Sequence, residues 1–107
     1  MPFFNAAQRT SRTIGPGVHL GTMWGDNIMV SVVNLDANAK VPAHTHPHEQ
    51  MGMVLEGFLT MTIGEETQVL TVGDVYLAPT NTEHSVAAGD VNTKVLDIFS
   101  PPREDYK

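Results

Sequence analysis

The sequence contains no cysteine and little positive charge. Without cysteine the chain can form no disulfide and no zinc ribbon, and it can perform no thiol catalysis. Any transition-metal site must therefore use imidazole, carboxylate or amide ligands. Six lysines and arginines stand against twelve aspartates and glutamates, which gives a formal net charge of -6 at pH 7. Because no basic stripe can neutralise a phosphate backbone, nucleic acid is not expected as a partner.

A long continuous hydrophobic run is also missing. The first residues, MPFFNAAQRTSRTIG, carry two arginines behind a very short apolar start, which fits neither a signal peptide nor a membrane span. We therefore expect a cytoplasmic protein with no membrane partner. A chain of 107 residues is long enough for one domain and too short for a second independent core.

Short runs rich in Val, Met, Leu and Thr make up most of the sequence. Gly, Asp, Asn and Pro punctuate them at intervals of roughly 8 to 12 residues, a pattern typical of β-sandwiches and barrels. The predicted strands cover residues 18–24, 27–35, 41–46, 51–63 with a break at Gly57, 67–71, 74–78, 84–88 and 93–99. The sequence therefore predicts a single all-β, antiparallel domain over residues 1–107, with a core barrel over about 18–100 and a C-terminal tail over 101–107.

Two of these strands are apolar on both faces instead of alternating. Residues 29–33 and 95–99 place hydrophobic side chains at nearly every position. A strand of this kind is expected to cover one face with the core and the other with a further layer or a second subunit. We therefore predict a homodimer.

Four potential metal ligands, His44, His46, His48 and Gln50, stand at alternate positions in AHTHPHEQ. A regular strand would place all four on one face, but Pro47 belongs at an edge or a bulge, so alternation alone does not say which of them converge. Two interpretations stay open at this point: a metal site, or a histidine-rich polar loop.

The same stretch resembles the first motif of the cupin superfamily. That motif is a histidine pair, three or four residues, an acidic or amide ligand, six residues and a glycine. Here it becomes His44, His46, Gln50 and Gly57, with Gln50 in place of the commoner glutamate. The glycine that often opens the motif is Asn38, and Asn is the usual substitute for Gly in turns.

The second cupin motif is matched further along the chain. A glycine, five residues, a proline and a histidine five positions later correspond to Gly73, Pro79 and His84, with Asn81 in place of a turn glycine. The resemblance implies a compact jelly-roll barrel, that is, an antiparallel double-stranded β-helix. It also implies a metal held by the residues at the ligand positions of the two motifs: His44, His46, Gln50 and His84. His48 is left as a supporting donor or an exposed side chain, while His19 is expected to be structural or on the surface.

The implied ligand set is three imidazoles and one amide, which leaves the charge of a divalent cation uncompensated. Such a site favours a small anionic substrate, such as a carboxylate. Ligand type does not choose between Ni, Zn, Fe, Mn, Cu and Co.

The C-terminal segment KVLDIFSPPREDYK places an acid, Asp97, on the same strand face as Val95 and Phe99. An unpaired buried carboxylate is costly, so Asp97 is expected either to accept hydrogen bonds from nearby backbone or to pair with Arg103. The final residues are either a solvated tail stiffened by two prolines or part of a site.

This ending resembles that of one cupin group, the KdgF pectin-degradation proteins, which also share HTHPHEQ and a VLEG-like run. The shared D-x-F-x-P-x-R-E-D pattern is formed here by Asp97, Phe99, Pro101, Arg103, Glu104 and Asp105. The resemblance implies conversion of 4,5-unsaturated monouronates, left by pectate or alginate lyases, into linear 4-deoxy-5-keto sugars. It also implies that Asp97, Phe99 and Arg103 are catalytic residues. From their chemistry we nominate Asp97 as acid and base, Arg103 to hold the substrate and Phe99 to wall the pocket.

Two other functions remain open for the same fold. A metal-dependent dioxygenase would consume oxygen with turnover, and a binding or sensor protein would return its anionic ligand unchanged. The ending from Asp97 to Asp105 is the feature that favours the isomerase-type enzyme, because the fold alone is shared by all three.

Overall fold

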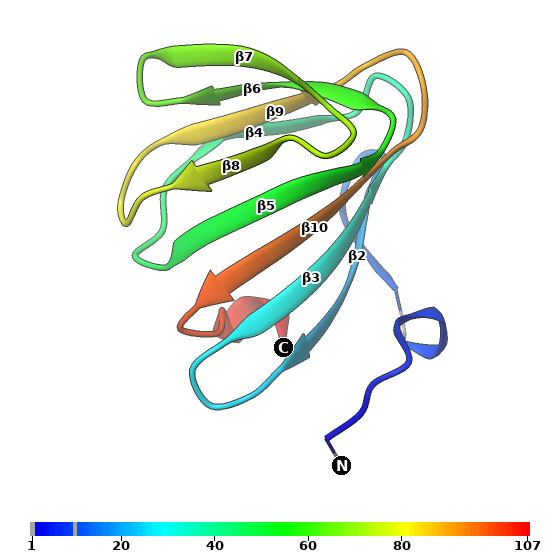
Figure 1. Ribbon diagram of the computed structural model, residues 1–107, viewed down its shortest axis with the longest axis vertical. Helices are drawn as coiled ribbons and strands as arrows, with labels where there is room; N and C mark the ends of the chain where they lie inside the picture. Colours follow the sequence, from blue (N-terminus) through cyan, green and yellow to red (C-terminus); the bar gives the residue numbers. More distant parts are fainter. Residues whose placement is uncertain (1, 10) are drawn as a thin grey trace.

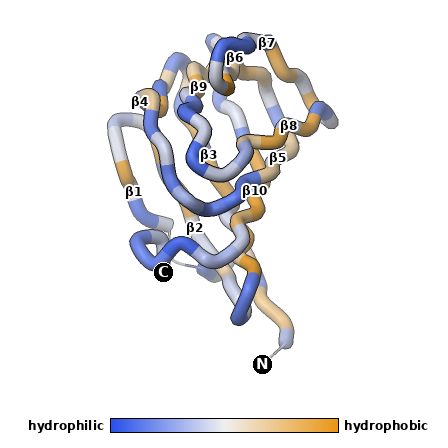
Figure 2. Tube along the Cα trace, turned by 90° about the vertical axis from the view of Figure 1, so that its left-hand side faces the viewer, coloured by the Kyte–Doolittle hydropathy of each residue, from blue (hydrophilic) through white to orange (hydrophobic). Residues whose placement is uncertain are grey.

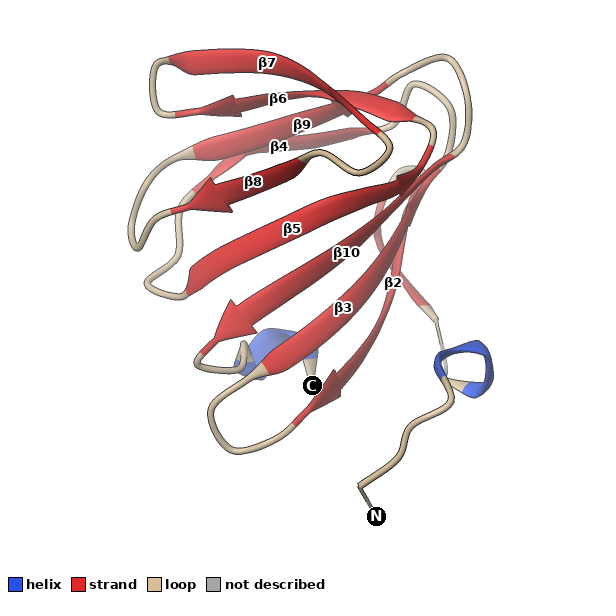
Figure 3. Ribbon diagram, viewed as in Figure 1, coloured by secondary structure: helices blue, strands red, loops and turns tan. Residues whose placement is uncertain are grey.

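Within residues 2–9 and 11–107, which the computed structural model describes, ten strands and two short 3₁₀ helices form (Figure 3). Their bounds are η1 Ala6–Gln8, β1 Arg12–Gly15, β2 Val18–Trp24, β3 Met29–Leu35, β4 Lys40–His44, β5 Glu49–Glu56, β6 Phe58–Ile63, β7 Glu66–Thr71, β8 Val75–Ala78, β9 His84–Ala88, β10 Thr93–Ser100 and η2 Glu104–Tyr106. The predicted all-β fold class is confirmed.

The strands form two sheets that face each other and curl into a jelly roll (Figure 1). The six-stranded sheet has the order β1-β2-β3-β10-β5-β8, and the four-stranded sheet has the order β4-β9-β6-β7. Each pair of neighbours is antiparallel, as predicted. The hydrophobic core lies between the sheets and includes Val18, Leu20, Val33, Leu35, Val54, Leu59, Met61, Leu70, Ala88 and Val95.

Turn residues with left-handed backbone conformations set where the strands reverse. Asn38 and Asn81, the two asparagines at glycine positions of the cupin motifs, have φ of 64° and 59°. Asparagine tolerates this region better than other residues with a side chain, so both substitutions fit their turns. Gly57 has φ of 75°, and a Cβ there would overlap Thr93 and the Asn92 carbonyl. Gly57 therefore ends β5 and lets β6 begin at once.

Most predicted strands are present, with shifted boundaries. The predicted break at Gly57 is confirmed, since it separates β5 from β6. The predicted strand over 41–46 ends at His44 because the chain turns before Pro47. β1 was not predicted. Its residues are mostly exposed, so they show no hydrophobic alternation, although the following Gly-Pro-Gly sequence is a turn signal that closes it onto β2.

The C-terminal tail folds back onto the barrel, so the interpretation of residues 101–107 as a solvated tail is wrong. Pro102 is buried, and η2 carries Tyr106 against the Phe99 ring with ring centroids 5.8 Å apart. The Thr22 hydroxyl donates a 2.6 Å hydrogen bond to the Tyr106 carbonyl. The tail therefore forms one wall of the cavity between the sheets.

The outer face of the six-stranded sheet is apolar. Side chains of β5 and β8 on this face are exposed, and those of β3 and β10 are half-buried, as the run of hydrophobic residues along β5 and β8 in Figure 2 illustrates. The residues of this outer face are Val30, Val32, Met51, Met53, Leu55, Val75, Leu77, Leu96 and Ile98. No other layer covers them in the described part of the chain.

No helix within residues 2–9 and 11–107 is long and apolar enough to cross a membrane.

Candidate metal centre

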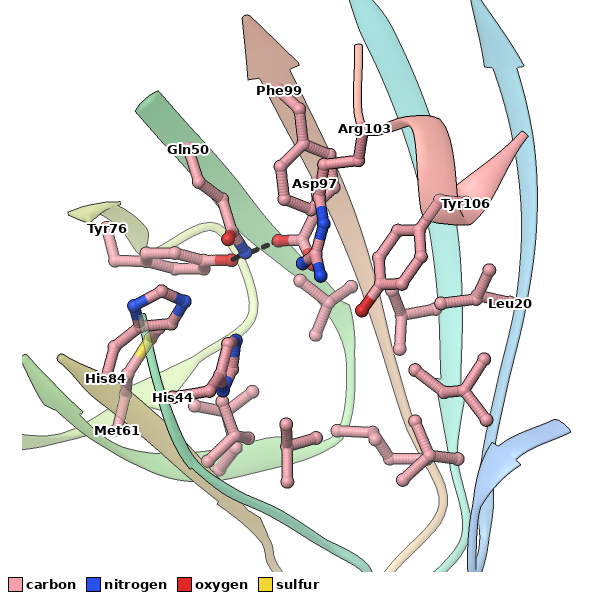
Figure 4. A pocket seen from close by; sticks show the side chains of 18 residues that line it. Leu20, His44, Gln50, Met61, Tyr76, His84, Asp97, Phe99, Arg103 and Tyr106 are labelled. Carbon is pink, nitrogen blue, oxygen red and sulfur yellow. Dashed lines mark hydrogen bonds between the residues drawn. The ribbon is translucent and has the colours of Figure 1, made fainter. Parts of the chain in front are cut away.

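Both cupin motifs deliver their side chains to the same end of the barrel. His44 ends β4 and pairs with His84, the first residue of β9. Gln50 lies at the start of β5 and pairs with Phe99 near the end of β10. These four residues line one cavity between the sheets, which Figure 4 shows from close by. Residues 40 positions apart in the sequence thus become neighbours through strand pairing.

Three histidines form a compact cluster at this end. One ligand atom from each of His44, His46 and His84 lies within 4.8 Å of the others. Ring centroids are 4.3 Å apart for His44 and His84 and 4.9 Å apart for His46 and His84. His46 and His84 are buried, and His44 is half-buried. The predicted convergence of the early histidines with His84 is confirmed.

Backbone carbonyls select the same tautomer in all three imidazoles. The Nδ1 atoms of His44, His46 and His84 lie 2.8, 3.0 and 2.9 Å from the carbonyl oxygens of Pro42, His48 and Thr82. A carbonyl only accepts, so each Nδ1 must carry the hydrogen. In the neutral ring, each Nε2 then presents a lone pair toward the cluster.

Burial keeps the two inner rings neutral. It is the main cause that lowers the pKa of His46 to about 4, and the positive charge of Arg103 adds to the effect. Burial also lowers the pKa of His84, against a backbone hydrogen bond that raises it. At neutral pH these rings are therefore lone-pair donors for a cation and not cations themselves.

Gln50 adds an oxygen to the cluster. Its Oε1 lies 3.0 Å from His46 Nε2, while its Nε2 donates a 2.7 Å hydrogen bond to the Tyr76 hydroxyl. An oxygen and an unprotonated nitrogen at this distance are both acceptors, and the buried Nε2 of His84 has no hydrogen-bond partner. A divalent cation would satisfy all of these lone pairs at once, so the residues present fit the metal that the cupin motifs imply.

The remaining histidines and Glu49 lie outside the cluster. His48 is half-buried and contributes its backbone carbonyl to the orientation of His46, and its Nδ1 has no partner among the described residues. Glu49 is exposed. His19 lies on the surface, where it contacts Thr13 and Asp36.

Asp97 lies beside the cluster and is bound by a residue that the sequence did not single out. The Tyr76 hydroxyl donates to Asp97 Oδ1, and neither a backbone group nor Arg103 takes that place. Both expected partners of Asp97 were therefore wrong. Tyr76 stands at an inward position of β8, eight residues before His84, so its nearness to the second motif and its alternation with Ala78 could have indicated it.

Burial dominates the chemistry of the Tyr76–Asp97 pair. It raises the pKa of Asp97 to about 6, although the hydrogen bond from Tyr76 opposes the shift. It also raises the pKa of Tyr76, as does the neighbouring charge of Asp97. A carboxyl group with this pKa can both take up and return a proton near neutral pH.

Phe99 and Arg103 complete the cavity wall. The Phe99 ring packs edge to face against His46 at a centroid distance of 5.8 Å. The Arg103 guanidinium lies 3.8 Å from the Tyr106 ring centroid and 5.3 Å from that of Phe99. Its Nη2 and Nε donate to the carboxylate of Asp105 at 3.0 and 3.3 Å, so part of its fork already holds an anion.

Comparisons with known proteins agree with this geometry. The family model described as Cupin domain matches residues 31–99. The pectin degradation protein KdgF of Dickeya dadantii is 32% identical over 84 residues, which are 78% of this chain and 76% of that protein. The structure of KdgF from a Halomonas species has a TM-score of 0.93 at 28% identity and covers 100% of this chain and 99% of that chain. An H2HPP isomerase of Bacillus subtilis is 27% identical over 95 residues, 87% of this chain but only 40% of that protein.

Proposed function

The chain belongs to the cupin family, and from that premise we propose that it acts in pectin or alginate breakdown as a metal-dependent isomerase. Its substrates would be 4,5-unsaturated monouronates, and its products linear 4-deoxy-5-keto uronates. The similarity to KdgF supports the pathway, and the similarity to an H2HPP isomerase supports the reaction class.

One observation carries the proposal: ring nitrogens of three imidazoles and the oxygen of one amide converge next to a buried carboxyl group, Asp97. The set contains no charged ligand, so a bound divalent cation would keep its full charge. It would supply Lewis-acid stabilisation for the negative charge that develops on an enol oxygen next to a carboxylate. That is the arrangement of the ring oxygen and carboxylate in an unsaturated uronate.

The protein's own contribution to the reaction is proton transfer. Asp97 takes the proton of the anomeric hydroxyl, C1 becomes an aldehyde and the bond from C1 to the ring oxygen breaks, which leaves the electron pair on that oxygen. A proton returned to C4 then converts the enol carbon C5 to a ketone. Atoms and electrons balance within the substrate, and one carboxyl group with a pKa of about 6 serves both transfers.

Positive side chains at the open end of the cavity suit an anionic sugar. Four of the six basic residues lie around the Tyr106 and Trp24 rings: Arg9, Arg12, Arg103 and Lys107. Of these, Arg103 pairs with Asp105 and Lys107 with Glu104. Arg103 lines the cavity itself, and Arg12 lines the adjoining groove together with Tyr106. In a chain of net charge -6, this cluster attracts a negative substrate to the one end where the candidate ligands are.

The function is tested by adding metal-loaded protein to an unsaturated monouronate freshly released by a lyase, with oxygen excluded. We expect the absorbance of the conjugated double bond to disappear faster than in the uncatalysed control. If the sugar binds and is recovered unchanged, the proposed activity is wrong and the protein is a binding protein. If turnover starts only when oxygen is admitted, the proposed isomerase activity is wrong and the protein is a dioxygenase.

We also propose that two copies associate through the outer face of the six-stranded sheet. The face spans four strands spaced about 4.8 Å apart, and its patch of roughly 20 by 20 Å is about as large as the largest apolar patches on monomers. Charged groups stand only at its two ends, as Glu49 and the Lys94–Glu56 pair. A partner must therefore be apolar over the same area, and a second copy offers such a surface.

A further inference from the structure

A row of polar side chains crosses the inner face of the six-stranded sheet at the depth of Asp97. Strand register aligns Thr22 with Ser31, Ser31 with Asp97, Asp97 with Gly52 and Gly52 with Tyr76. Thr22, Ser31, Asp97 and Tyr76 are all buried. An inner face would ordinarily be apolar at such positions, so this row needs a purpose other than packing.

Gly52 makes contact between the two sides of the row possible. It stands in β5 between Tyr76 of β8 and Asp97 of β10, and a Cβ at this position would overlap both the Asp97 carboxylate and the Tyr76 ring. Its φ is not in the left-handed region, so turn geometry does not require glycine here. The missing side chain leaves the space through which the phenol reaches the carboxylate (Figure 4).

The hydrogen bonds of Tyr76 have a fixed direction. A phenol has one hydrogen, and Tyr76 donates it to Asp97. Its oxygen must then accept from Gln50, which can happen only through Nε2 of the amide. The other end of the amide, Oε1, is thereby turned toward His46 and the histidine cluster.

We propose that Tyr76 is a positioning residue that makes Gln50 an oxygen ligand of the metal centre. An amide can present either an oxygen or an NH₂ group, and only the oxygen can bind a cation. The phenol selects the oxygen, Asp97 fixes the phenol, and Gly52 keeps the two in contact. This inference rests on the metal centre of the proposed function, but not on the sugar that is converted.

The same series of hydrogen bonds explains why position 50 is glutamine and not glutamate. A glutamate at position 50 would put a second carboxylate against the phenol that already serves the buried Asp97 carboxyl group. When both are ionised, the two carboxylates would compete for the one phenol hydrogen, and neither could donate to the Tyr76 oxygen. The amide is therefore the ligand that lets a buried acid lie next to the metal centre.

Cobalt titration of Tyr76→Phe tests the assignment, with affinity measured by calorimetry and ligand geometry by the visible spectrum of bound Co²⁺. Removal of the hydroxyl frees the amide to rotate, so we expect affinity to fall by roughly 10- to 100-fold, the usual cost of losing a partner that orients a ligand. Tyr106→Phe is the matched control, because it removes the other phenol of the cavity, which lies over Arg103 and not at Gln50. We expect this control to bind cobalt as tightly as the unchanged protein.

A double-variant cycle separates positioning from general damage. If Tyr76 acts through Gln50, then Tyr76→Phe should cause no further loss of cobalt affinity in a Gln50→Ala background. An equal loss in both backgrounds, or no loss in the single variant, would overturn the assignment. Should Tyr76→Phe not fold, Gly52→Ala takes its place, because it displaces the phenol and keeps every hydrogen-bonding atom. It should likewise lower cobalt affinity alone and cause no further loss in the Gln50→Ala background.

The titration contains no sugar, so its result is independent of the assay for function. A protein that follows this pattern with cobalt but leaves the uronate unchanged would overturn the proposed reaction and support the ligand assignment. If the protein converts the uronate and its Tyr76→Phe variant binds cobalt equally well, the proposed reaction would be supported and the ligand assignment overturned.

Discussion

Each face of the six-stranded sheet departs in one place from what solvent exposure alone would select. Its inner face carries a buried polar row that includes Asp97 and Tyr76, while its outer face exposes Met51, Met53 and Leu77. Strands sort side chains by alternation, and alternation says only that two faces differ. The inner face has polar side chains where apolar ones would pack the core, and these form the candidate site. The outer face has apolar side chains where polar ones would face solvent, and these are expected to contact a partner.

This difference predicts that the two faces can be damaged separately. Substitutions on the inner face should remove metal binding or turnover and leave assembly intact. Substitutions on the outer face should change assembly and leave the metal centre intact. If substitutions on one face changed both metal binding and assembly, the two faces would not have separate roles.

The largest effect is expected from His84→Ala. This change removes one of the three imidazoles of the cluster, from the strand that joins the second motif to the first. Metal affinity should fall by more than the ~100-fold typical of lost supporting residues, and turnover should fall to that of metal-free protein. Metal content after dialysis measures this. His19→Ala is the matched control, since the His19 ring hydrogen-bonds Thr13 and Asp36 on the surface. Stoichiometric metal in His84→Ala would contradict the site.

Asp97→Asn should cost about 10²- to 10⁴-fold in kcat, the usual contribution of general acid–base catalysis. The amide keeps the shape of the carboxyl group and can still accept from Tyr76, but it cannot take up a proton. Metal should remain bound, which separates this change from the loss of a ligand. A variant with full activity and bound metal would remove Asp97 from the proton transfer.

On the outer face, Met53→Glu should raise the dimer dissociation constant by ~100-fold or more, because an unpaired carboxylate would be buried in the contact. Met53 pairs with Leu96 and Val75 at the middle of the face. Sedimentation velocity over a dilution series measures the shift, and metal affinity should not change. Thr60→Glu, on the outside of the other sheet, is the control. A wild-type protein that is monomeric at all concentrations would refute the dimer.

The parts that sequence could predict are those with a local signature. The paired motifs located His44 and His84, and Asn38 and Asn81 occupy the left-handed positions that their glycine-like placement predicted. Alternation also placed Asp97 on an inner face beside Phe99. In each case the information lies within a few residues or in a fixed motif.

The parts that sequence could not predict depend on pairing between distant strands. Tyr76 meets Asp97 only because β5 stands between their strands and carries glycine at position 52. The contact of Arg103 with Asp105, which the turn after β10 brings to it, was not predicted either. Such contacts follow from register and from a folded-back tail, neither of which has a local pattern.

The smallest effect is expected in the pH dependence of the metal-free protein, where two buried groups of the site, His46 and Asp97, oppose each other. The pKa of His46 falls from 6.5 to about 4 on folding, so acidification through this window favours the unfolded state, which binds the proton more readily. The pKa of Asp97 rises from 3.8 to about 6, so the same acidification favours the folded state. The two contributions offset each other, and the melting temperature should change little between pH 6 and about 4. In Asp97→Asn the contribution of the acid is gone, while the lowered pKa values of His46, His84 and Asp105 remain, so the melting temperature should fall more steeply as the pH is lowered through this window. An equal slope in both proteins would show that the buried acid is not protonated there.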